Sequence, residues 1–444
     1  MAGPAILQLS EALCATRFDG IPTQISKRAA DCILDALGSG LAGRSARSTR
    51  AIQTVMAHDA RRGAASVWFT NLHLSPIPAA TINAMAATAL DIDDGHRRIA
   101  GHPGAAVIAA ALAVAEELDT SMTDLISAVV VGYEAAVRVA LARNPEHHSS
   151  TVSGRWSGVG AAAAAAWLRK VKPSVMAEAI LIAEQHAPRV SSAMYHGFAG
   201  SDVKEAIAWS VQSGLYATEL AGAGFTGYPD TFDQGILYDA ITLCRNLDRF
   251  DAIKGLFFKP YACCRWIHSA IDGLSELMQV AALQASDIND VHVRTFRRAV
   301  SLGNHVSPKS EAQAQFSIPF CLGVVAVHGA EALTPIDPAL LQDTEVRSFA
   351  RKVRVDFDAE IDSKFPELAP AKVAIISEGK TFDIRVDAAF GDPTNPMSRR
   401  DLQNKFTVLT RGLIASDRRA QLVTALEKRA AGSVRDVLSE LIGN

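Results

Sequence analysis

The stretch GAAVIAAALAVAEELDTSMTDLISAVVVGYEAAVRVALA, residues 104–142, decides the fold class of this chain. It contains segments at 104–118 and 122–142 that are dominated by Ala, Val and Leu and show little alternation of apolar and polar residues. Pro103 precedes the first segment, where the missing N–H of a proline costs a helix little. The second segment ends before Pro145, which does not continue a helix. The sequence therefore predicts consecutive helices here.

The same helical texture extends over about residues 26–265. Over 26–43 apolar residues recur at helical spacing, and we expect Ser26 to cap this helix and Gly43 to end it. The run of alanines at 161–166 predicts a helix that approaches its neighbours closely, because alanine side chains are small. This part of the chain is therefore predicted to be helical.

A different pattern begins after about residue 273, where β-branched residues alternate with polar ones as in half-buried strands. The expected strands are 291–294, 353–356, 372–375 and 382–386. Helices are expected between them at 316–331 and 343–352. After a proline-bearing break at 391–396, helical periodicity returns over 398–441.

These patterns predict a mainly α protein in which a large all-helical domain is interrupted by a smaller α+β domain. We expect the helical domain at 1–268, the α+β domain at 269–394, and C-terminal helices at 395–444 that pack back on the helical domain. The chain has 444 residues, 49% of them hydrophobic and 20% charged, so it can bury a large core in two domains.

Composition excludes several classes of function. The chain has 44 Lys and Arg against 47 Asp and Glu, a net charge of -3, which predicts no nucleic-acid partner and no anionic membrane partner. No secretory signal is visible, and we expect no apolar run of the roughly 18 residues that a membrane span needs. The 6 cysteines show no C-x-x-C spacing, so we predict reduced thiols in a cytoplasmic protein.

Polar residues gather in the otherwise apolar helical region, and buried polar groups are costly unless they are paired or functional. The first cluster, LDIDDGHRRIAGHPG at 90–104, holds Asp91, Asp94, His96 and His102 beside a helix start. Carboxylates and imidazoles together predict an acid–base site. The alternatives are helix capping by the aspartates and metal binding by Asp and His, although the H-E-x-x-H spacing of a zinc enzyme is absent.

The second and third clusters follow along the chain. The loop at 147–154 includes His148 and Ser150, which could hold a carboxylate or form a solvated turn. Lys204 precedes a helix expected at 205–220, and it is either a cation for a substrate or an ordinary surface charge.

The fourth cluster places Lys259, Arg265 and His268 beside an apolar stretch, and Arg265 offers a two-pronged clamp for a carboxylate. The adjacent Cys263 and Cys264 are expected to pack in the core rather than to pair. The chain contains no G-x-S-x-G, P-loop or G-x-G-x-x-G motif in a suitable context. Acid–base chemistry on an anion therefore remains as the predicted activity.

In their order along the chain, these clusters resemble the MmgE/PrpD superfamily, which includes 2-methylcitrate dehydratase, cis-aconitate decarboxylase and iminodisuccinate epimerase. The resemblance runs nearly end to end and is carried by residues 35–38, 90–104, 148–166, 204–227, 259–272, 311–319 and 396–406. It implies a homodimer, an active site in a cleft between the domains, a small polycarboxylate substrate, and no metal or organic cofactor.

The resemblance also implies roles for individual residues. The catalytic residues would be Asp91, His102, His148 and Lys204, with His102 as the base, Asp91 orienting it, and His148 as the second proton-transfer group. The resemblance implies Lys259, Arg265 and His268 as substrate-binding residues, and from the polar clusters themselves we add Asp94, His96 and Ser150 as predicted substrate contacts. Cations among these residues would neutralise carboxylates and stabilise the enolate-like charge that forms when the α-proton leaves.

This chain departs from the resembling decarboxylases at Gly95, where they carry a threonine, at Phe320, where they carry a tyrosine, and at Cys264, where they carry a histidine. The lost hydroxyl groups disfavour decarboxylation. We therefore predict a lyase that dehydrates a small polycarboxylate, like 2-methylcitrate dehydratase. The alternatives are an epimerase of a dicarboxylate, a decarboxylase of the cis-aconitate type, and a catalytically silent protein that binds carboxylates.

Overall fold

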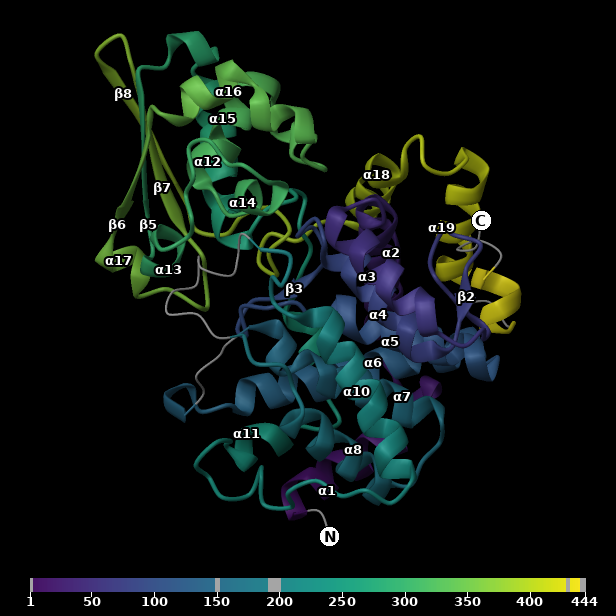
Figure 1. Cartoon of the computed structure of the whole chain (residues 1–444). Coiled ribbons are helices and arrows are strands. Elements are labelled where there is room, and N and C mark those ends of the chain that lie inside the picture. The colour runs from purple at the N-terminus through teal and green to yellow at the C-terminus, as the bar shows by residue number, and fades with distance from the viewer. Residues whose placement is uncertain (1–2, 148–151, 191–200, 429–431, 440–444) are drawn as a thin grey trace.

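The computed structural model describes residues 3–147, 152–190, 201–428 and 432–439, and it confirms the mainly α class. A large helical body forms the lower and right-hand side of the molecule in Figure 1, and a smaller part with a four-stranded sheet forms the upper left. The yellow C-terminal helices lie beside the helical body, so segments from both ends of the chain build it.

Helices account for most of the body, and the expected helices at 104–118 and 122–142 are confirmed with the same bounds. The expected cap at Ser26 is wrong, because the helix begins at Thr23, directly after Pro22, whose fixed φ suits helix entry. The helices are α1 (Pro4–Ala15), α2 (Thr23–Gly43), α3 (Arg47–Asp59), α4 (Pro76–Thr88), α5 (Gly104–Leu118), α6 (Met122–Ala142), α7 (Ser157–Leu168), α8 (Pro173–Gln185), α10 (Ile207–Gly222) and α11 (Ala240–Cys244).

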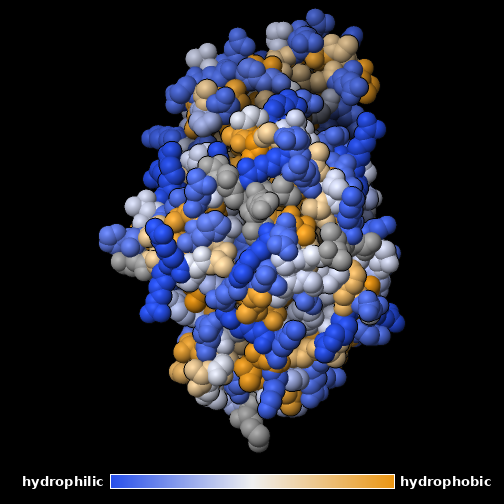
Figure 2. Space-filling view, turned by 90° about the vertical axis from the view of Figure 1, so that its right-hand side faces the viewer, coloured by the Kyte–Doolittle hydropathy of each residue, from blue (hydrophilic) through white to orange (hydrophobic). Residues whose placement is uncertain are grey.

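Helix α6 contradicts the expectation that no apolar run is long enough to span a membrane. It has 21 residues and a window of mean hydropathy 1.8, so by length and composition alone it could cross a membrane. However, 89% of that window is buried inside the protein, as in the core helix of a soluble protein. Figure 2 shows a face on which hydrophilic residues predominate and hydrophobic residues form scattered groups, which is also typical of a soluble protein.

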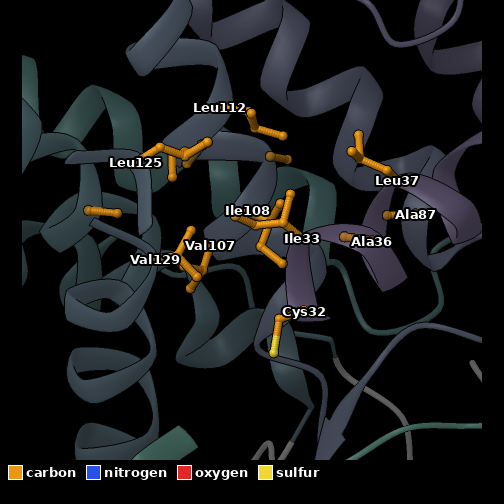
Figure 3. Close-up of a cluster of buried hydrophobic side chains, with 14 of the residues drawn as sticks. Cys32, Ile33, Ala36, Leu37, Ala87, Val107, Ile108, Leu112, Leu125 and Val129 are labelled. Carbon is orange, nitrogen blue, oxygen red and sulfur yellow. The ribbon is translucent and has the colours of Figure 1, made fainter. Parts of the chain in front are cut away.

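The core of the body lies where α2, α4, α5 and α6 meet. Figure 3 shows the side chains of Ile33, Val107, Ile108 and Val129 meeting there, and all of them are fully buried. Helix α5 is buried on every side over residues 104–116, as expected for a central helix that is apolar all round. The N-terminus of this central helix is therefore held firmly, and the first predicted cluster leads directly into it.

Small residues let the central helices approach one another closely. A Cβ added to Gly132 of α6 would lie 2.5 Å from Cγ1 of Val107, and one added to Gly160 of α7 would lie 2.7 Å from the carbonyl oxygen of Gly132. The alanines at 161–166 are all fully buried. The tight packing predicted for this run is thus confirmed.

The smaller part contains a sheet with strand order β6-β5-β7-β8. Strand β5 pairs parallel with β6 and antiparallel with β7, which pairs antiparallel with β8. In Figure 1, α12 (His268–Val280), α15 (Ile318–His328) and α16 (Thr344–Ala350) lie on one face of the sheet. The expected strands are confirmed with slightly longer bounds, namely β5 (Asp290–Thr295), β6 (Val353–Phe357), β7 (Ala371–Ser377) and β8 (Lys380–Val386).

The C-terminal helices α18 (Arg399–Thr410) and α19 (Ser416–Lys428) return to the body, where they pack on α2. The buried Nζ of Lys405 in α18 donates to Oδ1 of Asp35 in α2 at 2.5 Å and to the carbonyl oxygen of Ile92 at 2.6 Å. Helix α18 thereby stabilises the segment that carries the first predicted cluster. The domain boundaries at 268/269 and 394/395 stay a prediction.

Candidate active site

Two short strands bring the first and the fourth predicted clusters together. Strand β3 (Gly95–His96) pairs antiparallel with β4 (Leu256–Phe257), and Gly95 lies opposite Phe257. Figure 1 shows β3 where the helical body meets the sheet part. Because Lys259 and Arg265 follow β4 closely along the chain, this pairing places their cations beside the carboxylates and imidazoles that flank β3.

The carboxylate of Asp91 is the centre of the cluster. Its Oδ1 lies 2.8 Å from Nζ of Lys259 and 3.5 Å from Nε2 of His102. Lys259 is 0% exposed and Asp91 is 5% exposed, so water screens this ion pair little. Asp91 has a φ of 52°, in the left-handed region that non-glycine residues rarely adopt and that is often found at functional sites. Among the described residues, none donates a hydrogen bond to its buried Oδ2.

The imidazole of His102 is oriented by the residues just before it. Its Nδ1 lies 3.0 Å from the carbonyl oxygen of Asp94 and 3.3 Å from Oδ2 of Asp93, so Nδ1 carries a hydrogen and donates it. The backbone N–H of His102 donates to Oγ of Ser153 at 2.9 Å. Nε2 is thereby left facing Asp91.

The charge on His102 follows from its neighbours. Burial opposes the imidazolium, but the charges of Asp93 and Asp91 outweigh burial and raise the pKa of His102 to about 9. Burial also opposes the charged form of Asp93, yet the charge of His102 and its hydrogen bond lower the pKa of Asp93. Both shifts describe the same imidazolium–carboxylate pair. At neutral pH His102 therefore holds a proton that it can donate.

Lys204 belongs to the same charged network but lies on another side of Asp91. Its Nζ donates to the carbonyl oxygens of Thr88 at 3.0 Å and Ala89 at 2.8 Å, so it fastens the end of α4 close to Asp91. Burial lowers the pKa of Lys204. The alternative of an ordinary surface charge is therefore wrong, because Lys204 is 6% exposed. It borders a separate pocket, next to Arg47.

The structure places Asp94 behind His102 rather than at a binding surface. Its Oδ1 accepts the N–H of Gly104 at 3.0 Å, and its Oδ2 accepts the hydroxyl of Tyr133 at 2.5 Å. Burial and the charge of Asp35 raise the pKa of Asp94 to about 7. The capping alternative thus holds for Asp94, and its position does not support the predicted contact with a substrate.

The predicted substrate contacts of His96 and His268 are also unsupported. Burial lowers the pKa of His96 to about 3, and its ring packs on Gly255, where an added Cβ would lie 2.3 Å from Nε2. Burial and the charge of Arg265 lower the pKa of His268, whose ring nitrogens lie 3.1 Å from Nη1 of Arg265 and 3.2 Å from the carbonyl oxygen of Cys263. Both are neutral, buried rings that support their neighbours.

A narrow pocket opens beside the cluster, between the helical body and the sheet part. It is lined by Asp91, Arg97, Ala100, Gly101, His102, Glu205, Phe257, Cys264, Arg265, Trp266 and Phe316. The space left inside is about that of one water molecule. A larger ligand therefore has to displace side chains or separate the two walls.

The sequence analysis missed Arg97 and Asp392. Oδ2 of Asp392 lies 2.5 Å from Nη2 of Arg97 and 3.5 Å from Nη2 of Arg265. Arg265 also donates to the carbonyl oxygens of Phe390 and Ala389. Arg97 stands within the first cluster and could have been singled out there, but Asp392 is 295 residues away and carries no local signal. The guanidinium groups of Arg97 and Arg265 both line the pocket.

His148 and Ser150 lie outside the described residues, so their predicted roles stay predictions. The chain just after them reaches the site, because the backbone N–H of Ser153 donates to Oε2 of Glu205 at 2.8 Å and the hydroxyl of Ser153 contacts the same carboxylate. Glu205 in turn lines the pocket.

The metal-binding alternative concerns Asp91, Asp93 and His102, which each place a ligand atom within 4.8 Å of the others. However, Nζ of Lys259 already lies 2.8 Å from Oδ1 of Asp91, and its positive charge would repel a divalent cation at that position. The charges of the cluster therefore favour an ammonium over a metal ion.

We accordingly expect treatment with EDTA to leave the midpoint of thermal unfolding unchanged, and added zinc or magnesium not to raise it. The Lys259→Met variant provides the comparison, because it removes the competing ammonium and leaves the carboxylates open to a cation. A rise in the wild-type midpoint on addition of zinc would show that the site binds metal after all.

The fold and this geometry define a two-part, mainly helical protein with a buried acid–base cluster beside a cationic pocket. Comparison with known families identifies residues 7–243 as an MmgE/PrpD N-terminal domain and residues 261–428 as an MmgE/PrpD C-terminal domain. The chain therefore belongs to the MmgE/PrpD family.

Its relatives include the cis-aconitate decarboxylase of Homo sapiens, 26% identical over 407 residues, which covers 86% of this chain and 83% of the relative. They also include the cis-aconitate decarboxylase-like protein oryM of Aspergillus oryzae, 24% identical over 464 residues, which covers 95% of this chain and 94% of the relative. A decarboxylase is a lyase, so these relatives support a lyase at that coarse level.

Proposed function

We propose that the protein is a lyase that removes the proton next to a carboxylate of a small polycarboxylate and expels a β-hydroxyl as water, without a metal or an organic cofactor. The observation that carries the proposal is the contact between His102, Asp91 and Lys259 at the wall of a pocket that two guanidinium groups also line. We place the protein in the cytoplasm, where its free cysteines would stay reduced.

In the proposed reaction, Lys259, Arg97 and Arg265 attract the carboxylates of the substrate and stabilise the enolate-like charge. The α C–H bond breaks as Asp91 takes the proton, and its electron pair forms the carbon–carbon double bond. The β C–O bond then breaks, and Nε2 of His102 donates the proton that turns the leaving hydroxyl into water. Transfer of a proton from Asp91 to His102, across the 3.5 Å between Oδ1 and Nε2, restores both groups.

This scheme differs from the predicted roles, in which His102 is the base and Asp91 orients it. A base must be unprotonated at the start, whereas a pKa of about 9 keeps His102 protonated at neutral pH. Because both groups lie on one wall of the pocket, the proton and the hydroxyl would leave from the same face of the substrate. Lys204 would support the site by fastening the end of α4. Asp91 and His102 carry both proton transfers in this scheme, so the role predicted for His148 stays a separate prediction.

The test is incubation of the purified protein with a panel of di- and tricarboxylates in heavy water, followed by NMR. We expect deuterium at the α-carbon of one acid and accumulation of the corresponding unsaturated acid. Exchange without loss of water would instead indicate an epimerase. Stabilisation by the acids without exchange or product would indicate a silent binding protein.

Decarboxylation is the second candidate, because the relatives are named as cis-aconitate decarboxylase and its like. Release of carbon dioxide from cis-aconitate in the same panel would support it. One feature argues against it, because Gly95 offers no hydroxyl beside the Phe257 ring. Phe320 is fully buried and does not line the pocket, so the absence of a hydroxyl at that position is no argument either way.

We also propose a homodimer, as the family resemblance implies. Helix α10 exposes Trp209 (47%) and Tyr216 (51%) on one helical face, and aromatic residues are enriched at protein interfaces. Light scattering should therefore give a mass of about twice 47.2 kDa, and the double variant Trp209→Glu/Tyr216→Glu should shift the mass towards the monomer. A wild-type protein with the mass of one chain would contradict the proposal.

A further inference from the structure

Across the β3–β4 ribbon, the ring of Phe257 packs directly on Gly95. A Cβ added to Gly95 would lie 2.3 Å from Cζ and 2.6 Å from Cε2 of that ring, closer than side chains approach in proteins. The ring therefore occupies the space into which any other side chain at position 95 would project. Where a hydroxyl-bearing residue at this position would offer a hydrogen bond, this chain presents an aromatic surface.

Two neighbouring arginines also hold the Phe257 ring in place. The guanidinium carbons of Arg97 and Arg265 each lie 5.0 Å from the centre of the ring, within cation–π range. The ring is 3% exposed, and it lines the pocket together with Trp266 and Phe316. The lining of the pocket therefore includes an aromatic surface beside its charged groups.

Part of the hydrogen-bonding capacity of the neighbouring cations is already used by the protein itself, although Nε of Arg265 has no partner among the described residues. Nε and Nη2 of Arg97 both donate to Asp392, and the terminal nitrogens of Arg265 donate to the carbonyl oxygens of Phe390 and Ala389. A substrate hydroxyl placed against the face of the Phe257 ring would lose its bonds to water and gain no equivalent bond from the ring, which is unfavourable. A methyl or methylene group in the same place would lose nothing.

We infer that Phe257, seated over Gly95, determines the specificity of this pocket, and that the substrate places a hydrocarbon group against its ring. This inference rests on the proposed function and deepens it. The substrate class is a small hydroxy acid with carboxylates towards the cations, its leaving hydroxyl towards His102, and an alkyl or alkylene carbon towards Phe257.

The test compares binding of 3-methylmalate and tartrate by calorimetry, because one carbon carries a methyl group in the first acid and a hydroxyl in the second, while both acids carry a hydroxyl on the other carbon. We expect the wild-type protein to bind 3-methylmalate about tenfold more tightly, the usual order for one apolar group in a fitted pocket. In the Phe257→Ala variant the ratio should fall to about twofold or less, because the apolar wall is lost.

The matched control is the Phe258→Leu variant. The ring of Phe258 is also covered by a guanidinium, that of Arg28 at 4.3 Å, but Phe258 does not line the pocket. This control should keep the wild-type ratio. If Phe257→Ala fails to fold, Phe257→Gln serves in its place, because it keeps much of the volume but offers an amide, and it should bring the ratio to unity or reverse it.

Any of three results would overturn the inference. The wild-type protein could bind the two acids equally or bind neither detectably, or the ratio of affinities could stay unchanged in Phe257→Ala and Phe257→Gln. Binding is measured here without turnover, so this outcome is separate from failure of the proposed function. A protein that shows the expected ratio but neither exchanges hydrogen nor releases water with any acid would refute the dehydration and leave the specificity of the pocket standing.

Discussion

The His102→Asn variant is expected to lose hydrogen exchange and water release by about 10²- to 10⁴-fold, the usual loss when a positioned proton donor is removed. Asparagine can still donate to the carbonyl oxygen of Asp94, which contacts Nδ1 of His102 at 3.0 Å, but it cannot supply a proton to a leaving hydroxyl. The measurement is the rate of deuterium incorporation and product formation with the acid that the panel identifies.

The matched control for this variant is His328→Asn. His328 also pairs with an aspartate, since its Nε2 lies 2.8 Å from Oδ2 of Asp343, but its side chain is 38% exposed on the surface. This control should keep wild-type rates. If His102→Asn retained full activity, His102 would be neither the acid nor the base.

The pH dependence separates the two roles of His102. As an acid it must be protonated, so the rate should fall as pH rises through about 9; as a base it must be unprotonated, and the rate should rise over the same range. The free energy of unfolding is also expected to fall as pH rises. The folded-state pKa of about 9 lies above the ordinary 6.5, so the contribution of His102 to stability is complete below pH 6.5 and disappears as pH rises through 9.

The Lys259→Met variant is expected to lose about 3–5 kcal/mol of unfolding free energy, because breaking a buried ion pair leaves an uncompensated charge. Nζ of Lys259 lies 2.8 Å from Asp91 while 0% of its side chain is exposed, and its charge also acts on Asp93. Without it, both carboxylates stay buried with only His102 and the more distant charge of Lys204 to compensate them. Urea unfolding measures the loss.

Lys254→Met is the control for this effect. Its Nζ lies 2.8 Å from Asp251, the same distance as in the buried pair, but the two side chains are 48% and 51% exposed. An exposed pair of this kind contributes about 1 kcal/mol or less. The double variant Lys259→Met/Asp91→Asn should recover part of the lost stability. A Lys259→Met protein as stable as Lys254→Met would show that Asp91 and Asp93 do not depend on this cation.

Local sequence patterns predicted the elements of this protein well. The helices at 104–118 and 122–142 and the strands of the small sheet follow from periodicity over a few residues, which is decided by which side chains can face the core. The same local reasoning failed at Ser26, because the helix begins earlier, directly after Pro22. It also failed in the expectation that no apolar run is long enough to span a membrane, because α6 is that long but is buried in the core.

The candidate site was predicted only in part. Asp91, His102, Lys259 and Arg265 stand in polar clusters of an otherwise apolar region, and the structure brings them together at one pocket or directly behind it. His96, His268 and Asp94 stand in the same clusters but face away from the pocket. Residue type and spacing could not separate the two groups, because both kinds of residue look alike along the chain.

The sequence by itself determined the class of fold, the order of the helical and the sheet-bearing segments, and the family, since these depend on local periodicity and on ordered motifs. Only the tertiary structure decided that His102 is charged, that Asp94 serves as a helix cap, and that Asp392 joins Arg97 to Arg265. A pKa or an ion pair depends on which charges folding brings within a few ångströms and away from water. The aspartates that charge His102 stand only a few residues before it, but the fold sets their distance and burial, whereas Asp392 lies 295 residues from Arg97 along the chain.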